Sequence, residues 1–209
     1  MLALYSLEVY MRSRFLVVCL MAVFVGITAL AQTKPAPSAP AKTATQAPAK
    51  AGPVAPPTTD AEKIKSAMSA APAAIAKDAT IVDMPSMNVL RQGTNGWTCF
   101  PDGPSPGVDP MCIDKNGMEW AQAWMSHKDP PAGKMAVGYM LMGGSDASNT
   151  DPFATEPKAG DKWVDTGPHM MVMNIADHFA GYPTTATNTK VPYVMYAGTP
   201  YAHLMIPVK

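Results

Sequence analysis

The sequence predicts an α+β fold in which a mostly antiparallel β-sheet carries two short packed helices and one disulfide. Residues 60–209 contain several short apolar runs separated by Gly, Pro and Asn, which is typical of strands joined by turns. Two other stretches of this region place apolar residues at helical spacing. Strands and helices do not alternate at the spacing of parallel βαβ units, so an antiparallel sheet is favoured.

The N-terminus has the pattern of a secretory signal peptide. Two arginines precede a continuous apolar run, and Ala29-Leu30-Ala31 supplies the small residues of a cleavage site. We therefore assign residues 1–31 to a signal peptide, with Met11 as an alternative start because the ten residues before it fit the pattern poorly. The apolar run is short for a membrane span, so we expect an exported protein, periplasmic or extracellular, with no stable span after cleavage.

Residues 32–59 are predicted to be a disordered Ala/Pro-rich linker. They include no aromatic residue and one large aliphatic, Val54, so they cannot bury enough apolar surface to fold. The remaining stretch, 60–209, has the usual length of a single globular domain. It contains 11 Lys and Arg against 15 Asp and Glu, and this mildly acidic balance argues against nucleic-acid binding.

Two cysteines remain after removal of the signal peptide, because Cys19 lies within it. An even pair in an oxidising compartment predicts a disulfide between Cys99 and Cys112. A catalytic thiol and a zinc site are the alternatives. Zinc requires about four ligands, however, and no second pair of Cys or His stands at ligand spacing.

The elements in the first half of the domain are predicted from local signals. A helix begins at Asp60, the expected N-cap, and ends near Pro72. Strands at 79–84 and 88–92 follow. The turn at Asn95-Gly96 then predicts a hairpin that leads into a strand at 97–100.

A second helix is predicted over residues 116–127, where Trp120 and Trp124 lie one turn apart on an apolar face. A loop of about twenty residues, 145–164, interrupts the strands that follow, and a loop of this length is usually functional or disordered. The remaining predicted strands are 134–144, 169–175, 193–198 and 201–208.

Five segments of the domain together resemble a family of exported bacterial proteins to which no activity has been assigned. The segments are NGWTCFPD, PMCID, GGSDASNTDP, GPHMM and YVMYAGTPYAHLMIP. The similarity covers the domain from about Asp60 and does not include the linker. It implies the domain boundary, and it implies no ligand, cofactor or catalytic residue.

Two segments each place a histidine two residues before a methionine: His169 with Met171, and His203 with Met205. Residues two apart on a strand project from the same face. Each segment follows a Gly or Gly-Pro break, which predicts that both histidines stand at one end of a sheet, near Tyr201. Two imidazoles and two thioethers that converged there would suit Cu(I). The alternative is core packing, because Met fills irregular cores well.

A second candidate site lies in the long loop, where hard oxygen ligands are concentrated. Asp146, Ser148, Asn149 and Asp151 could contribute to a weak calcium site, although their spacing does not match an EF-hand. The alternative is turn formation, because these residue types cap turns through nearby backbone groups.

The sequence leaves three functions open. We expect a secreted cell-envelope domain that binds a small ligand, a metal ion or a protein partner. An exported enzyme, with a hydrolase foremost, is the first alternative: His169, His203, Asp146 and Tyr201 could share a cleft, but no G-x-S-x-G motif occurs. A structural envelope protein is the second alternative. Whether the chain is catalytic is left open, and neither copper nor calcium is favoured over no cofactor.

Overall fold

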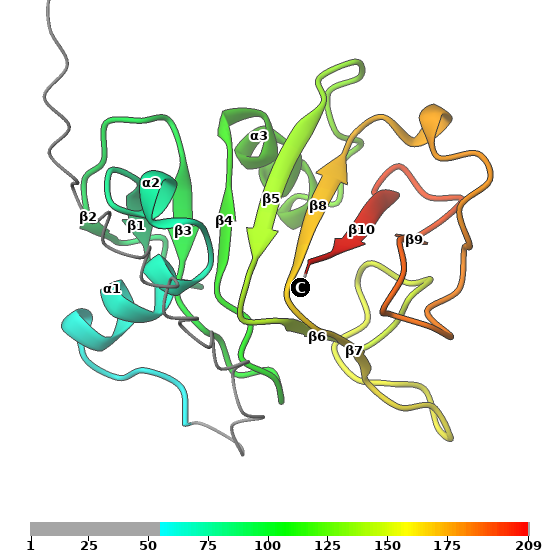
Figure 1. Cartoon of the computed structure of the whole chain (residues 1–209), viewed down its shortest axis with the longest axis horizontal. Coiled ribbons are helices and arrows are strands. Elements are labelled where there is room, and N and C mark those ends of the chain that lie inside the picture. The colour runs from blue at the N-terminus through cyan, green and yellow to red at the C-terminus, as the bar shows by residue number, and fades with distance from the viewer. Residues whose placement is uncertain (1–54, 209) are drawn as a thin grey trace, which may run out of the picture. The chain divides into compact units, whose positions relative to one another are not determined.

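The computed structural model describes residues 55–208. The predicted signal peptide and the linker up to residue 54 lie outside this range. An eight-stranded mixed sheet, a two-stranded ribbon and helices packed on the large sheet make up the described part (Figure 1), which confirms the predicted α+β fold. Among residues 55–208, none of the helices combines the length and apolar character that a membrane span requires.

The large sheet has the strand order β2-β1-β3-β4-β5-β8-β10-β9. Its strands are β1 (Thr80–Val82), β2 (Val89–Arg91), β3 (Thr98–Phe100), β4 (Met111–Ile113), β5 (Ala136–Met140), β8 (His169–Met173), β9 (Tyr193–Met195) and β10 (His203–Pro207). β1 and β3 are parallel, and every other neighbouring pair is antiparallel. The predicted hairpin between β2 and β3 is wrong, because β1 pairs with both strands and separates them.

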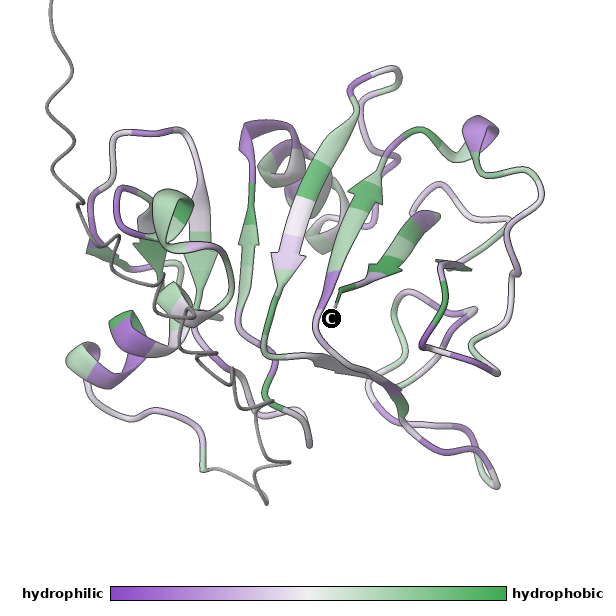
Figure 2. Ribbon diagram, viewed as in Figure 1, coloured by the Kyte–Doolittle hydropathy of each residue, from purple (hydrophilic) through white to green (hydrophobic). Residues whose placement is uncertain are grey.

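The two faces of the sheet are covered by different elements (Figure 1). Helices α1 (Asp60–Ser69) and α2 (Ala73–Ala76) lie in front of β1 and β3, whereas α3 (Lys115–Met125) lies behind β4 and β5. Packing contacts agree, since α3 places Met118, Trp120 and Ala121 against the methionine-rich core. The central strands are largely apolar and the connections are mostly polar (Figure 2), as expected for a sheet buried on both sides.

The N-terminal helix begins one residue earlier than the sequence suggested. Thr59, and not Asp60, is the N-cap: its hydroxyl accepts a hydrogen bond from the backbone N–H of Glu62 at 3.3 Å. The Glu62 carboxylate in turn accepts one from the Thr59 N–H at 3.0 Å, which completes a capping box. The backbone N–H groups of Thr59 and Thr58, which both donate to the carboxylate, lower the pKa of Glu62 to about 2.

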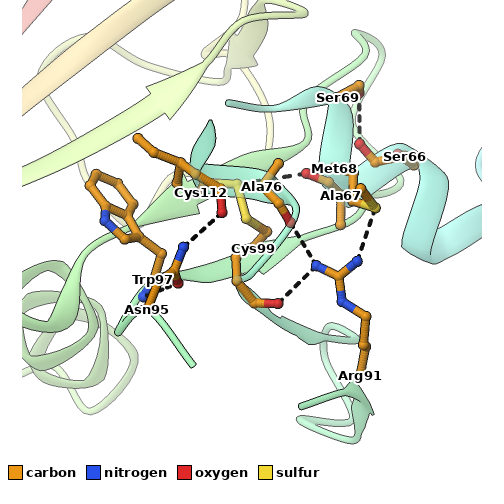
Figure 3. Close-up of a disulfide and its surroundings, with 12 residues drawn as sticks. Ser66, Ala67, Met68, Ser69, Ala76, Arg91, Asn95, Trp97, Cys99 and Cys112 are labelled. Carbon is orange, nitrogen blue, oxygen red and sulfur yellow. Dashed lines mark hydrogen bonds between the residues drawn. A yellow bond between two sulfur atoms is a disulfide. The ribbon is translucent and has the colours of Figure 1, made fainter. Parts of the chain in front are cut away.

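The predicted disulfide joins Cys99 on β3 to Cys112 on β4, and the two residues lie directly opposite each other in the pairing register (Figure 3). Both are fully buried under α1, whose Ala67 belongs to the same apolar cluster. Nearby, the Arg91 guanidinium donates to the carbonyl oxygens of Ala76 and Ala79 at 2.6 and 2.9 Å. The covalent bond joins two strands of the sheet, and the hydrogen bond from Arg91 on β2 to Ala76 attaches α2 to this half of it.

The long loop predicted at 145–164 is partly structured. Its ends form the ribbon of β6 (Gly144–Asp146) and β7 (Val164–Thr166). Its middle is attached to α3, since the Trp124 indole N–H donates to the carbonyl oxygen of Pro152 at 2.8 Å. The Phe153 ring stacks on the ring of His127, with their centroids 4.0 Å apart. The loop therefore covers the same side of the sheet as α3.

Candidate functional site in a histidine and methionine face of the sheet

One face of the sheet, formed by β5, β8, β10 and β9, gathers methionine and histidine side chains. Directly opposed residues of neighbouring strands project to the same side, so the pairing register identifies the members. Met171 is opposite Met205, and His203 is flanked by Met173 and Met195. We call this set the His–Met face. Its members are Met140, His169, Met171, Met173, Met195, His203 and Met205.

His169 is the first residue of β8 and is fully buried. Its Nδ1 lies 2.7 Å from the carbonyl oxygen of Gly167. A carbonyl oxygen can only accept, so Nδ1 carries the ring proton and Nε2 keeps a lone pair. This Nε2 is buried and has no hydrogen-bond partner among the described residues. Burial lowers the pKa of His169, which keeps the ring neutral.

Met140 and Gly144 lie beside the His169 ring, and Met171 is the next residue on the same face of β8. Met140 lies directly opposite on β5, and Met171 is two residues further along β8. A Cβ atom added at Gly144 would lie 3.2 Å from His169 Cε1 and 3.0 Å from Met140 Cε. Glycine thus allows the β6 backbone to approach the imidazole and the thioether closely.

His203 begins β10 and has a similar local arrangement. Its Nδ1 donates to the carbonyl oxygen of Tyr201 at 3.0 Å, so its lone pair is also on Nε2. Burial lowers the pKa of His203 to about 4. Aromatic rings contact the imidazole edge-on, with centroid distances of 5.7 Å to Trp120 and 5.3 Å to Tyr196.

The two histidines face the same side of the sheet but stand at opposite ends of the β8–β10 pair. His203 is opposite Met173, whereas His169 is opposite Pro207. The prediction that both stand at one end is wrong, because each begins its strand and the strands are antiparallel. Four residues along a strand correspond to roughly 13 Å. Ligands of one tetrahedral ion lie about 3–4 Å apart, so the register does not favour a shared ion.

A pair of carboxyl groups borders the His–Met face. The pKa of Asp109 is raised to about 6, first by burial and then by the charge of Asp102. The pKa of Asp146 is raised to about 6, first by burial and then by the charge of Asp109. The Tyr196 hydroxyl donates to Asp146 Oδ1 at 3.3 Å and opposes this rise. The sequence analysis did not identify Asp109 or Tyr196.

Of the four side chains proposed for a calcium site, Ser148 and Asp151 have oxygens engaged in turns, whereas Asn149 Oδ1 is buried without a hydrogen-bond partner among the described residues. Ser148 Oγ accepts hydrogen bonds from the backbone N–H groups of Thr150 and Asp151, at 3.1 and 3.0 Å. Asp151 Oδ1 accepts from the N–H of Phe153 at 3.0 Å. The Asn149 amide donates to the carbonyl oxygen of Thr184 at 2.9 Å. The local contacts of Ser148 and Asp151 support the turn interpretation for these two residues, and the contacts of Asn149 and Asp146 are long-range.

The side chains proposed for a hydrolase, His169, His203, Asp146 and Tyr201, form no hydrogen bond with one another; His203 bonds only the backbone carbonyl of Tyr201. The Tyr201 hydroxyl donates to the carbonyl oxygen of Lys128 at 2.9 Å, and its ring packs on Trp120 and Phe153. Both histidine rings use Nδ1 for a backbone carbonyl. Within residues 55–208, no Ser, Thr or Cys side chain is hydrogen-bonded to either ring, so the nucleophile and base pairing of a hydrolase is not formed there.

A surface groove of about 310 Å³ lies elsewhere, between the connection that follows α3 and the 3₁₀ turn Ala176–His178. It contains His178 and neither of the predicted histidines. No group of three or more His, Cys, Asp or Glu side chains in the described part of the chain is arranged to hold a metal ion. A metal bound by the His–Met face would therefore take most of its ligands from thioethers.

Comparison with known proteins finds no matching family model, no similar curated protein and no similar solved structure. The resemblance to an exported bacterial family stays a prediction. The function must therefore be argued from the geometry of the His–Met face.

Proposed function

We propose that the chain is an exported cell-envelope protein that binds a soft monovalent cation, Cu(I), through the His–Met face. The observation that carries the proposal is His169 Nε2, a buried lone pair without a partner beside methionine side chains. Neutral imidazole and thioether are ligands that Cu(I) prefers. Metal-binding histidines usually donate their other ring N–H to a carbonyl or carboxylate, as His169 and His203 do here.

Binding is favoured over hydrolysis because neither ring has a hydroxyl or thiol partner. Binding is favoured over a purely structural role because a core imidazole normally has both nitrogens satisfied. The leader sequence supports export, and the disulfide is consistent with an oxidising compartment.

The test is competition for Cu(I) between the full-length mature protein and a chromogenic chelator. Met171→Leu with Met205→Leu removes two thioethers at nearly constant volume, so the fold should be retained. We expect the affinity for Cu(I) to fall by more than about 100-fold, beyond the usual effect of losing an outer-shell partner. Met135→Leu is the matched control, because Met135 is 52% exposed and lies outside the His–Met face.

A histidine series separates binding by the face from adventitious surface binding. His169→Ala and His203→Ala in one chain should release Cu(I), whereas His127→Ala with His178→Ala should not, because His127 and His178 are exposed. Equal affinity of wild type and the Met171, Met205 double variant would overturn the proposal and leave the face as core packing.

A further inference from the structure

The two imidazoles of the His–Met face differ in how much room they leave for a cation. The rings of Trp120 and Tyr196 contact His203 edge-on, with interplanar angles of 82° and 70°. His169 has no aromatic partner of this kind among the described residues, and its Nε2 is the buried ring nitrogen without a hydrogen bond. His203 Nε2 also keeps a lone pair, so the His169 end is distinguished by a donor atom that is fully buried, unpartnered and free of aromatic contacts among the described residues.

The Met140 thioether lies at the same end, whereas the Cε of Met171 lies beside Gly138. Met140 is directly opposite His169, and Met171 shares its strand and face. A Cβ added at Gly144 would lie 3.5 Å from Met140 Sδ and 3.2 Å from His169 Cε1. The Met140 sulfur and the His169 imidazole thus both lie near the position that a Cβ of residue 144 would occupy. A small cation requires ligands that converge in this way.

This end of the face also lies close to solvent. Gly167, which accepts the Nδ1 hydrogen bond of His169, is exposed, and Met140 is only partly buried. The backbone N–H of Gly143 donates to the carbonyl oxygen of Met140 at 3.1 Å, which closes a tight turn. Met142 occupies this turn and is 46% exposed. One turn therefore joins the exposed thioether of Met142 to the partly buried thioether of Met140.

We infer that Cu(I) is bound by a single imidazole, His169 Nε2, with the thioethers of Met140 and Met171, and that it reaches them through Met142. This inference rests on the proposed function. Loading is a ligand exchange in which one metal–sulfur bond breaks as the next forms. No proton or electron is transferred, because thioethers carry no acidic proton, the Nδ1 proton stays on His169 in its hydrogen bond to the Gly167 carbonyl oxygen, and copper remains Cu(I) throughout.

The equilibrium test uses the full-length mature protein and Cu(I) supplied from a chelator. Met140→Leu and Met171→Leu should each weaken binding by about 10-fold or more, whereas Met173→Leu and Met195→Leu at the His203 end should leave it unchanged. Gly144→Ala should also weaken binding, because the new Cβ displaces Met140 and His169. Gly103→Ala is its control, since a Cβ there meets no atom within 4 Å.

The kinetic test follows loading and release by stopped flow. Met142→Leu should slow both by the same factor, about 10-fold, because a route residue lowers the barrier in both directions. Copper binding that depends on Met173 and Met195 but not on Met140 would overturn this inference and leave the proposed function standing. Unchanged rates in Met142→Leu would overturn the access route. Absence of Cu(I) binding by the wild type would overturn both proposals.

Discussion

The two faces of the sheet are filled by different kinds of side chain. The cluster between α1 and its face of the sheet is made of alanines, Ile81 and a disulfide: Ala67, Ala70, Ala71, Ala79, Ile81, Cys99 and Cys112. The opposite face, under α3, holds long thioethers and two imidazoles. Methionine has three rotatable bonds and adapts to irregular spaces, whereas alanine and a disulfide do not. The first face is built to fix the fold, and the second can rearrange around an occupant.

The largest expected effect is a loss of stability when the disulfide on the α1 side of the sheet is removed. Replacing Cys99 and Cys112 by alanine should lower the free energy of unfolding by about 3 kcal/mol, because the bond constrains the unfolded chain. The melting temperature should fall by roughly 6–12 °C. Thermal and urea unfolding measure the change, and thiol titration of the unfolded, unreduced wild type should find essentially no free thiol. Cu(I) binding by the folded variant should be retained.

If the two faces differ as described, substitutions on the His–Met face should lower the free energy of unfolding much less than removal of the disulfide does. Met171→Leu and Met205→Leu keep the side-chain volume, and each should cost less than about 1.5 kcal/mol. If either variant lost as much free energy of unfolding as the disulfide variant, the difference proposed between the two faces would be contradicted.

The second effect is a pH dependence at the border of the His–Met face. The pKa of Asp146 is about 6 in the folded protein and 3.8 ordinarily. Between these values the folded protein keeps a proton that the unfolded chain has lost, so this contribution to stability decreases as pH rises, by at most about 1.4 kcal/mol per pH unit. Asp146→Asn should therefore stabilise the protein more at pH 7 than at pH 4.

The contribution of His203 to stability changes with pH in the direction opposite to that of Asp146. Its pKa is lowered to about 4 from 6.5, so its contribution is lost as pH falls through that window. Removing the Asp146 carboxyl should make the acid side of the stability profile steeper. Urea unfolding at both pH values measures this, with the exposed Asp161→Asn as control. An equal effect of Asp146→Asn at both pH values would contradict the buried position of its carboxyl.

The smallest expected effect concerns the α1 side and is a test of its helix start. Thr59→Ala should cost about 1 kcal/mol, because it removes the side-chain acceptor for the Glu62 N–H. Asp60→Ala should cost less, because Asp60 interacts only with the helix dipole. Chemical unfolding measures both variants, and a larger loss for Asp60→Ala would favour the N-cap predicted from the sequence.

Local signals in the sequence predicted the helices well and the strand pairing poorly. Trp120 and Trp124 mark α3 because helical spacing is a property of consecutive residues. Strands of three residues show little alternation, and their partners are distant in sequence. The Asn95-Gly96 turn was identified, but the strand after it pairs with β1, because β2 already occupies the outer side of β1.

The candidate site was predictable only in part for the same reason. A separation of two residues correctly places His169 with Met171 on one face. Which end of the sheet each histidine occupies depends on strand direction, and the contribution of Met140 depends on cross-strand register. Neither property has a local signal. Asp109 was missed because it lies in the loop between the cysteines, and neither its burial nor its approach to Asp102 in that loop and to Asp165 on β7 has a local signal.

The edges of the sheet bear on how the protein behaves at high concentration. β2 and β9 are the outermost strands, and each is only three residues long. An edge strand exposes unpaired N–H and C=O groups to which another chain can add. Edges this short offer few such groups, even though Val89 on β2 is 56% exposed. They oppose growth of the sheet from one molecule into the next, which protects a crowded compartment from filament formation.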